Sequence, residues 1–303
     1  MPDSTPPIPT ETSAEKGGPS NLQLRLLWGI IGAALLLGSV WFSPVTFGLF
    51  FAAVQAVMLW EFYRMMRAGG YAPATWIGVV MGTTTFLVTC STQVYSSMKD
   101  ELGELWGVSV FGVVVFFLLV LPILLIIREM LVWPKFKQPF VNIATVIGGL
   151  LYISFPMTML VFISLSKANT YDYRRIFGLL FLIWASDIGA YAVGRAIGKH
   201  KLAPKISPGK TWEGWAGGFA MTLLVGWAIG FMLPDMPLTH RLVAAGVVAV
   251  FAPLGDLAES MLKRSVGVKD SGSIMPGHGG LLDRFDAFLL VLPVLALLQL
   301  LAE

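Results

Sequence analysis

Long apolar runs separated by short polar breaks make up most of the chain. The runs are about 20 residues long, the length that an α-helix needs to cross a bilayer, and they lack the ten-residue alternation of a membrane β-strand. We therefore predict an all-α fold, a polytopic transmembrane helical bundle of about nine membrane helices. The predicted spans are 24–42, 45–66, 74–92, 105–127, 140–166, 174–198, 212–233, 240–262 and 282–301.

The composition also indicates a membrane protein. Hydrophobic residues make up 56% of the 303 residues, charged residues make up 13%, and the mean hydropathy is +0.74. A soluble domain carries about a quarter charged residues, so that class is excluded. The single cysteine, Cys90, lies in an apolar run, which excludes an intramolecular disulfide and a cysteine metal site.

The basic residues predict how the bundle is oriented, because cytoplasmic loops carry an excess of Lys and Arg. Residues 1–20 are rich in Pro, Ser, Thr and Gly, and we interpret them as a disordered cytoplasmic tail. With this tail inside, most basic residues fall in cytosolic loops, and only the segment 167–175 departs from the pattern. We predict a multi-pass protein of the inner (cytoplasmic) membrane whose charged, glycine-rich loops face the cytosol.

Charged and polar residues concentrate in the segment 254–286. On a helix, four of them fall at i, i+3, i+4 and i+7 and share one face: Asp256, Glu259, Ser260 and Lys263. Asp256 lies several residues inside an apolar run, where a charge is costly and usually functional. A solvated, inert connection between two helices is the alternative interpretation, but it does not explain that position.

A glycine-rich loop at 276–280, which includes His278, leads to a second predicted helix start that carries Asp283, Arg284 and Asp286. Carboxylates from two helix ends, with cations and a flexible loop between them, suit a divalent metal that holds a polyphosphate. Asp256 and Asp283 are the candidate metal ligands.

A second group of polar residues lies in the segment 184–215. Asp187 and Arg195 share a helical face within a predicted span, together with Gly194 and Gly198, whose spacing allows a neighbouring helix to approach closely. The side chains of Asp187 and Arg195 therefore face either a polar cavity or each other. A structural intramembrane ion pair is the alternative to a binding role.

The loop that follows is basic and contains Lys201, Ser207 and Lys210. Its Ser-Pro-Gly-Lys-Thr resembles the end of a P-loop, but the first glycine and the preceding strand are missing, so it is not one. A basic turn before a helix can still bind phosphates through lysines and backbone N–H groups. A plain cytoplasmic loop would explain the lysines but not the serine and the glycine.

These two segments together resemble the phosphatidate cytidylyltransferases, integral membrane enzymes that make CDP-diacylglycerol from CTP and phosphatidic acid. The resemblance rests on Ser186-Asp187, Lys201-Leu202, the run 206–214, Ser260 to Arg264, Lys269-Asp270 and the pattern from Pro276 to Asp286, and it covers residues 184–290. In that family the carboxylates at the positions of Asp256 and Asp283 bind the catalytic metal. The resemblance also implies Mg²⁺, a possible K⁺ and a homodimer.

The resulting hypothesis is an Mg²⁺-dependent in-line nucleotidyl transfer in phospholipid biosynthesis. The candidate catalytic residues are Asp256, Asp283, Lys263, Arg264 and His278. The candidate substrate-binding residues are Ser260, Lys269, Asp270, Gly279, Gly280, Arg284, Asp286, Lys201, Ser207, Lys210, Asp187 and Arg195. The substrates would be CTP and a membrane lipid, with no nucleic acid involved.

Three other functions stay open at this point. A CTP-dependent lipid kinase of the polyprenol or phytol type would use similar carboxylates but transfer the γ-phosphate. A secondary transporter would place its charges near the bilayer midplane and have repeat symmetry, which the chain lacks. A purely structural membrane protein would leave Asp256, His278 and Asp283 unexplained.

The chain divides into three parts on these grounds: the tail 1–20, N-terminal membrane helices at 21–139, and a C-terminal membrane catalytic region at 140–303 with cytosolic-side loops 199–212 and 263–284. The first 140 residues carry no recognisable motif. We interpret Glu61 with Arg64 as a local surface pair and Glu129 as an interface residue.

Overall fold

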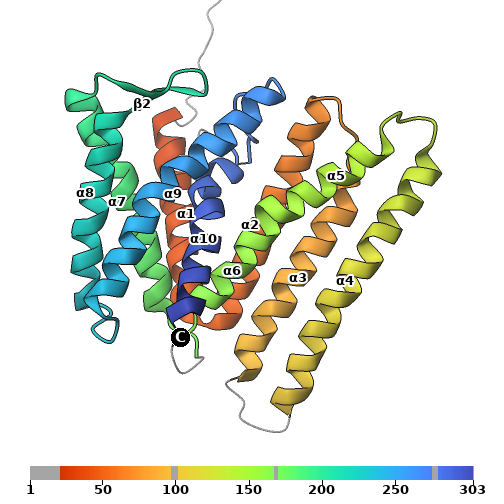
Figure 1. The fold of residues 1–303 in the computed structure, drawn as a ribbon, viewed down its shortest axis with the longest axis horizontal. Coiled ribbons are helices and arrows are strands. Elements are labelled where there is room, and N and C mark those ends of the chain that lie inside the picture. Colours follow the sequence, from red (N-terminus) through yellow and green to blue (C-terminus); the bar gives the residue numbers. More distant parts are fainter. Residues whose placement is uncertain (1–20, 97–101, 167–169, 275–278, 303) are drawn as a thin grey trace, which may run out of the picture.

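The structure is a computed structural model that describes residues 21–96, 102–166, 170–274 and 279–302 (Figure 1). The predicted tail 1–20 and His278 lie outside these ranges. The described chain is almost entirely helical, which confirms the predicted fold class. Its helices are α1 (Asn21–Phe42), α2 (Pro44–Ala68), α3 (Thr75–Ser96), α4 (Leu102–Val132), α5 (Pro139–Gly149), α6 (Phe155–Ile163), α7 (Tyr173–Ile197), α8 (Trp212–Ala228), α9 (Leu238–Ser265) and α10 (Leu282–Ala302).

Among the described residues, six helical segments are long and apolar enough to cross a membrane. They are Pro44–Ala68, Pro139–Ile163, Tyr173–Ile197, Trp212–Phe231, Leu238–Ser265 and Leu282–Leu301. Two shorter apolar helical stretches, Leu27–Phe42 and Thr75–Ser91, accompany them. The structure therefore supports a polytopic membrane protein, and nine spans with a cytoplasmic N-terminus stay a prediction.

Prolines shape two of these segments. A π-helical turn, η1 (Leu150–Ser154), joins α5 to α6 directly before Pro156, whose ring removes a helical N–H donor. In α9, Pro253 likewise cannot donate to the carbonyl of Ala249, and Trp215 Nε1 of α8 donates to that carbonyl instead, at 3.0 Å. A neighbouring helix thus satisfies a backbone group that would otherwise be unpaired in lipid.

Close helix contacts fix α7 against α8. A Cβ on Gly189 of α7 would lie 2.7 Å from the carbonyl oxygen of Gly217, and one on Gly218 would lie 2.7 Å from the carbonyl oxygen of Ser186. Gly194 and Gly198 similarly face Thr211 at the start of α8. The predicted seam of small residues is therefore present.

The segment between α7 and α8 is a β-hairpin and not the loop predicted from the sequence. Strand β1 (Lys201–Ala203) pairs antiparallel with β2 (Ser207–Thr211), with Lys201 opposite Thr211 and Ala203 opposite Ser207. Thr211 then caps α8 by accepting a hydrogen bond from the N–H of Gly214 at 3.1 Å. The hairpin extends over the ends of α7 and α8 (Figure 1).

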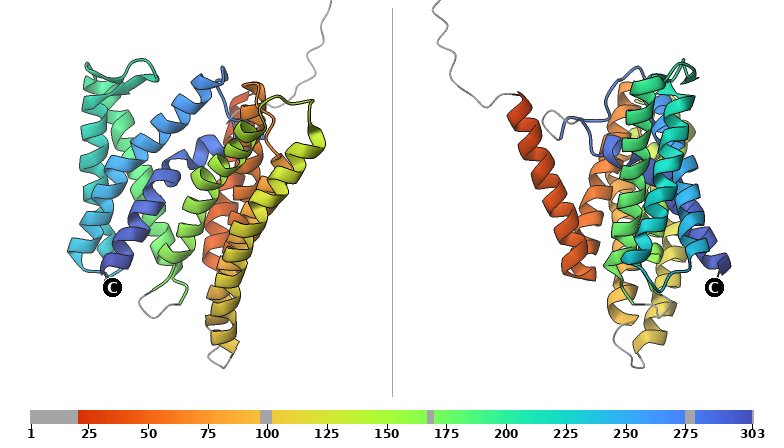
Figure 2. Two further views of the ribbon diagram at one scale, coloured as in Figure 1. Left: turned by 45° about the vertical axis from the view of Figure 1, so that its right-hand side comes forward. Right: turned by 90° about the vertical axis from the view of Figure 1, so that its left-hand side faces the viewer.

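The hairpin, the C-terminal end of α9 and the beginning of α10 lie at the same end of the bundle (Figures 1 and 2). The C-terminal end of α10 lies at the other end, beside the turn between α8 and α9. α2 lies in the interior beside α10, where Phe51 packs edge-on against Phe285 with ring centroids 6.1 Å apart. The N-terminal helices therefore contact the region that carries the motifs.

Candidate active site

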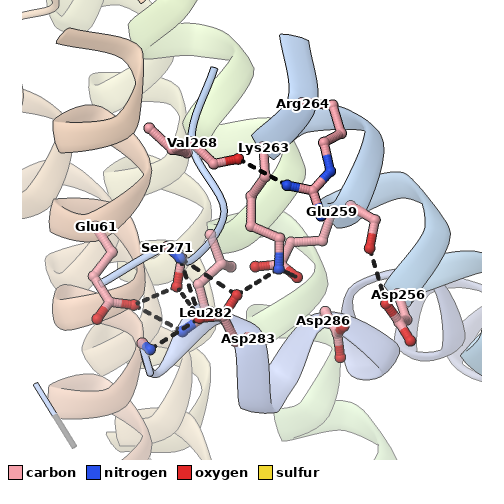
Figure 3. Close-up of polar contacts among 12 residues, drawn as sticks. Glu61, Asp256, Glu259, Lys263, Arg264, Val268, Ser271, Leu282, Asp283 and Asp286 are labelled. Atoms are coloured by element: carbon pink, nitrogen blue, oxygen red, sulfur yellow. Dashed lines mark hydrogen bonds and ion pairs between the residues drawn. The ribbon is translucent and has the colours of Figure 1, made fainter. Parts of the chain in front are cut away.

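The predicted polar face of α9 is present and contacts α10 (Figure 3). Ser260 Oγ donates to Asp256 Oδ1 at 3.2 Å. One turn further on, Lys263 Nζ donates to Glu259 Oε2 at 2.8 Å and to Asp283 Oδ1 of α10 at 2.6 Å. Glu259 is only 1% exposed and the Lys263 side chain 11%, so this ammonium group bridges two carboxylates in a shielded position.

Asp283 is held by donors on both of its carboxylate oxygens. Besides Lys263 on Oδ1, its Oδ2 accepts hydrogen bonds from Ser271 Oγ at 2.9 Å, the Ser271 N–H at 3.1 Å and the Gly280 N–H at 2.9 Å. Gly279 has a φ of +83°, a conformation that side-chain-bearing residues rarely adopt, and it lets the chain turn into α10. The carboxylate lies in the first turn of α10, where the helix dipole favours negative charge.

Asp256 is bound by a lysine from the hairpin. Lys210 Nζ of β2 lies 2.7 Å from Asp256 Oδ2 and also donates to the carbonyl of Pro253 at 3.1 Å. This contact joins the two polar segments 184–215 and 254–286. The Asp256 side chain is 43% exposed, far more than that of Asp283 at 12%, so it is the more accessible of the two predicted metal ligands.

Two further carboxylates lie near Asp256. Asp286 of α10 and Asp187 of α7 are within electrostatic range of Asp256, and Lys210 is the cation that acts on both. Figure 3 shows Asp286 next to Asp256, on the side of the cluster away from Glu61. Three carboxylates around one ammonium group leave a negative charge, which favours the binding of a further cation.

The remaining predicted cations lie exposed at the same end of the bundle. Arg264 Nη1 donates to the carbonyl of Val268 at 3.3 Å, Lys269 and Asp270 follow on the exposed turn, and Arg284 is exposed in the first turn of α10. Lys201 is exposed at the start of the hairpin. These side chains are therefore placed where soluble anions can reach them.

Asp187 and Arg195 do not form the ion pair that was considered as an alternative. Arg195 Nη1 donates to the hydroxyl of Tyr191 at 2.9 Å and its guanidinium lies over that ring, and no ion pair joins it to Asp187 within the described part of α7. Ser207 is half-buried in β2, where it pairs with Ala203 and not with the carboxylates. The structure therefore brings Asp187 and Lys210 to the α9 cluster but leaves Arg195, Lys201 and Ser207 outside it.

A model of the cytidylyltransferase family matches residues 23–301. The chain belongs to the cytidylyltransferase family. Curated relatives include the phosphatidate cytidylyltransferase of Bacillus subtilis, 35% identical over 91% of this chain and 96% of the relative, and that of Haemophilus influenzae, 32% identical over 90% and 96%. The Staphylococcus haemolyticus phosphatidate cytidylyltransferase is 49% identical over 39% of this chain and 45% of the relative. The family resemblance seen in the sequence is confirmed, and it extends into the N-terminal helices.

Glu61 and Ser271 belong to the surroundings of Asp283 but were not predicted as site residues. Glu61 is not in a surface pair with Arg64, because its side chain is fully buried and its Oε2 accepts hydrogen bonds from the Leu282 N–H at 2.8 Å and Ser271 Oγ at 3.3 Å. Arg64 instead lies over the ring of Trp60. Glu61 and Leu282 are 221 positions apart, so no local pattern indicates their contact.

Glu129 is also buried, at 5% exposed, where a membrane-interface residue was expected. It pairs with Arg128 and accepts a hydrogen bond from Asn142 Nδ2 of α5 at 3.1 Å. Asn142 in turn accepts a hydrogen bond from the Ala72 N–H at 2.9 Å. Glu129 therefore joins α4 to α5.

Two cavities are lined by described residues, and they differ in which parts of the bundle surround them. One, of about 640 Å³, lies at the opposite end of the bundle among α7, α9 and the end of α10, and it contains none of the predicted site residues. The other, of about 400 Å³, is lined by α2, α5 and the last turns of α9, including Phe62, Val141 and Leu262. The second cavity is mostly apolar, although Tyr71, Thr145 and Ser265 also line it.

Proposed function

We propose that the chain is a phosphatidate cytidylyltransferase, which converts CTP and phosphatidic acid to CDP-diacylglycerol and diphosphate. The observation that carries this proposal is that two lysine–carboxylate pairs, Lys210–Asp256 and Lys263–Asp283, lie at the same end of a membrane helix bundle (Figure 1). Membership of the cytidylyltransferase family and the named activity of the relatives support the same reaction.

In this reaction a phosphate oxygen of phosphatidate attacks the α-phosphorus of CTP. A new phosphorus–oxygen bond forms, the bond between the α-phosphorus and the bridging oxygen to the β-phosphate breaks, and diphosphate leaves with the electron pair. A phosphomonoester has a second pKa of about 6, so the attacking oxygen is already largely ionised at neutral pH. The protein therefore has to position two anions and neutralise their charge more than it has to remove a proton.

The cationic side chains divide this task. Lys210 and Lys263 would bind phosphate oxygens, since each already presents its ammonium group to an anion. Arg264, Lys269 and Arg284 would bind the outer phosphates, and a guanidinium can bind two oxygens at once. Ser260 and the backbone of Gly279 and Gly280 would donate further hydrogen bonds, as His278 would in the hypothesis drawn from the sequence.

The donor set fits a hard divalent cation. Asp286 and Asp187 lie within electrostatic range of Asp256, and each predicted ligand pairs with an ammonium group, which marks positions where positive charge is favourable. Across the described ranges no three acidic, His or Cys side chains are arranged as a metal site, and Lys263 and the loop already bind Asp283. Asp256 and Asp283 would hold Mg²⁺, with Asp286 beside them. Bound Mg²⁺ would supply charge neutralisation for the triphosphate and the departing diphosphate.

The lipid substrate would reach the site from the bilayer. The mostly apolar cavity between α2, α5 and α9 is lined by Leu262, Ser265 and Val266 of the last turns of α9 and would accommodate part of an acyl chain. We expect the charged end of the bundle to lie at the cytosolic face of the inner membrane, where CTP is found. A K⁺ ion and a homodimer, both implied by the family resemblance, stay predictions.

Product analysis tests the proposed reaction. Purified protein is incubated with phosphatidate, Mg²⁺ and CTP labelled either at the α- or at the γ-phosphate. We expect the α-label in CDP-diacylglycerol and the γ-label in diphosphate. Transfer of the γ-label to lipid would instead show a CTP-dependent lipid kinase and refute the proposal. Absence of lipid labelling from a folded, monodisperse preparation would refute both reactions.

A further inference from the structure

Glu61 of α2 is a buried carboxylate whose hydrogen bonds all go to the segment that carries Asp283. It accepts from the Leu282 N–H at 2.8 Å and from Ser271 Oγ at 3.3 Å, both through Oε2 (Figure 3). No ion pair accompanies it among the residues that the structure describes, and its Oε1 has no hydrogen-bond partner there. An acidic group so placed in a membrane helix is costly, so it calls for an explanation in the reaction or the fold.

The loop before α10 is shaped around this carboxyl group. A Cβ on Gly272 would overlap Glu61 Oε1, and a Cβ on Gly280 would overlap Ser271 Oγ and lie 2.8 Å from Glu61 Oε2. Glycine is therefore required at both positions for the chain to approach the carboxyl group this closely. The two glycines and Glu61 form a fitted contact between the N-terminal helices and the loop.

The groups that Glu61 touches are the groups that hold Asp283. Ser271 Oγ donates to Asp283 Oδ2 at 2.9 Å, and the Gly280 N–H donates to the same oxygen at 2.9 Å. Leu282, whose N–H Glu61 accepts, directly precedes Asp283 in the first turn of α10. Moving or removing the Glu61 carboxyl group therefore affects both the Ser271 hydroxyl, which binds Asp283 from the loop, and the first turn of α10, which carries Asp283.

We infer that Glu61 is a positioning residue for the proposed reaction, which acts through Ser271 and the start of α10 to fix the carboxylate of Asp283. This inference rests on the proposed function, and it gives the N-terminal helices, which carry no recognisable motif, a part in the active site. A helix start can be capped locally, as Ser43 caps α2 by accepting from the Thr46 N–H at 3.1 Å. For α10 the acceptor comes from a distant helix, which ties the orientation of Asp283 to the packing of the bundle.

Three variants of Glu61 separate positioning from general stability. Glu61→Leu removes the acceptor, Glu61→Asp withdraws the carboxyl group by one methylene, and Glu61→Gln keeps an acceptor oxygen in place. We expect kcat to fall about 10–100-fold in the Leu and Asp variants, the usual effect of losing a residue that orients a ligand, and the KM for phosphatidate to change less than about threefold. Glu61→Gln should stay within about threefold of the wild-type kcat.

Mn²⁺ binding, followed by electron paramagnetic resonance in the presence of CTP, provides a measurement that does not depend on turnover. We expect the affinity to fall about 10–100-fold in Glu61→Asp and to be retained in Glu61→Gln. Glu129→Gln is the matched control, because it alters another buried glutamate of the N-terminal helices that does not contact the loop. It should leave both kcat and Mn²⁺ affinity within about threefold of the wild type.

A double-mutant cycle with Ser271→Ala tests the route of the effect. If Glu61 acts through Ser271, Glu61→Asp should reduce kcat much less in the Ser271→Ala background than in the wild type. Fully additive effects, an unchanged kcat in folded Glu61→Asp, or equal losses in Glu61→Gln and Glu61→Asp would each overturn the inference. These outcomes are distinct from failure of the proposed function, in which the wild-type protein itself makes no CDP-diacylglycerol in the same assay.

Discussion

Asp283→Asn changes the side-chain volume little but removes an acceptor that the structure uses. Lys263 donates to Asp283 Oδ1, whereas Ser271 and Gly280 donate to Oδ2. An asparagine has only one acceptor oxygen, so its NH₂ group faces a donor whichever way the amide is turned. The less costly orientation keeps the oxygen toward the loop, where three hydrogen bonds are retained, and turns the NH₂ group toward Lys263.

The expected loss of stability follows from that orientation. The variant loses one charge-assisted hydrogen bond between side chains that are 11% and 12% exposed, and such bonds contribute about 1.5–3 kcal/mol. Lys263 keeps its bond to Glu259 at 2.8 Å, so the ammonium group is not left unpaired. We therefore expect the free energy of unfolding to fall by about 1.5–3 kcal/mol and the protein to remain folded.

Turnover should fall far more than stability. Removing one group that stabilises charge in a reaction costs about 100–1,000-fold in kcat, and Asp283 is a proposed metal ligand as well. The assay is CDP-diacylglycerol formation from CTP, phosphatidate and Mg²⁺, together with thermal unfolding in the same detergent. The control is Asp235→Asn, an 85% exposed carboxylate at the opposite end of the bundle, which should keep the wild-type rate. Wild-type turnover in folded Asp283→Asn would refute the role of this carboxylate.

Three further predictions concern the neighbours of this site. Lys210→Met should raise the KM for CTP about 10-fold or more, because it removes a charged donor. It should lower the free energy of unfolding by about 1 kcal/mol or less, because the Lys210–Asp256 pair is partly exposed. An unchanged KM for CTP would contradict a phosphate-binding role of Lys210. Trp215→Phe should lower the melting temperature, because the Ala249 carbonyl loses its hydrogen-bond donor at a cost of about 1–3 kcal/mol. Trp227→Phe, at an exposed position, is the control and should change the melting temperature less. Chelation with EDTA should abolish turnover and added Mg²⁺ should restore it; full activity in EDTA would exclude the metal.

The helices were predictable from the sequence because each apolar run is long and ends at proline, glycine or charge. The predicted break before Pro44 coincides with a helix cap, in which Ser43 and Thr46 bond each other's backbone N–H groups. The hairpin was not predictable, because Ser-Pro-Gly-Lys-Thr has the composition of a turn and its two short strands are stabilised mainly by pairing with each other.

The candidate site was predictable where it depends on one helix or on neighbouring residues. The shared face of Asp256, Ser260 and Lys263 follows from the helical period alone. By contrast, the contacts of Glu61 with Leu282 and of Lys210 with Asp256 depend on how helices far apart in sequence pack together. A buried acidic residue in an apolar run was the available signal for Glu61, and it was explained instead by the nearby Arg64.

At the end of the bundle that carries the proposed site, contacts of charged side chains link four elements one to the next: the hairpin, α9, α10 and α2. Lys210 joins the hairpin to α9 through Asp256, Lys263 joins α9 to α10 through Asp283, and Glu61 joins α10 to α2. Apolar side chains of similar volume would pack these elements at least as well in a membrane, because burying charge is costly. The links are therefore better explained by anionic substrates that need cations held at fixed positions. If they work as one unit, Lys210→Met should affect kcat less in a Glu61→Asp background than in the wild type, and strict additivity would show that they act independently.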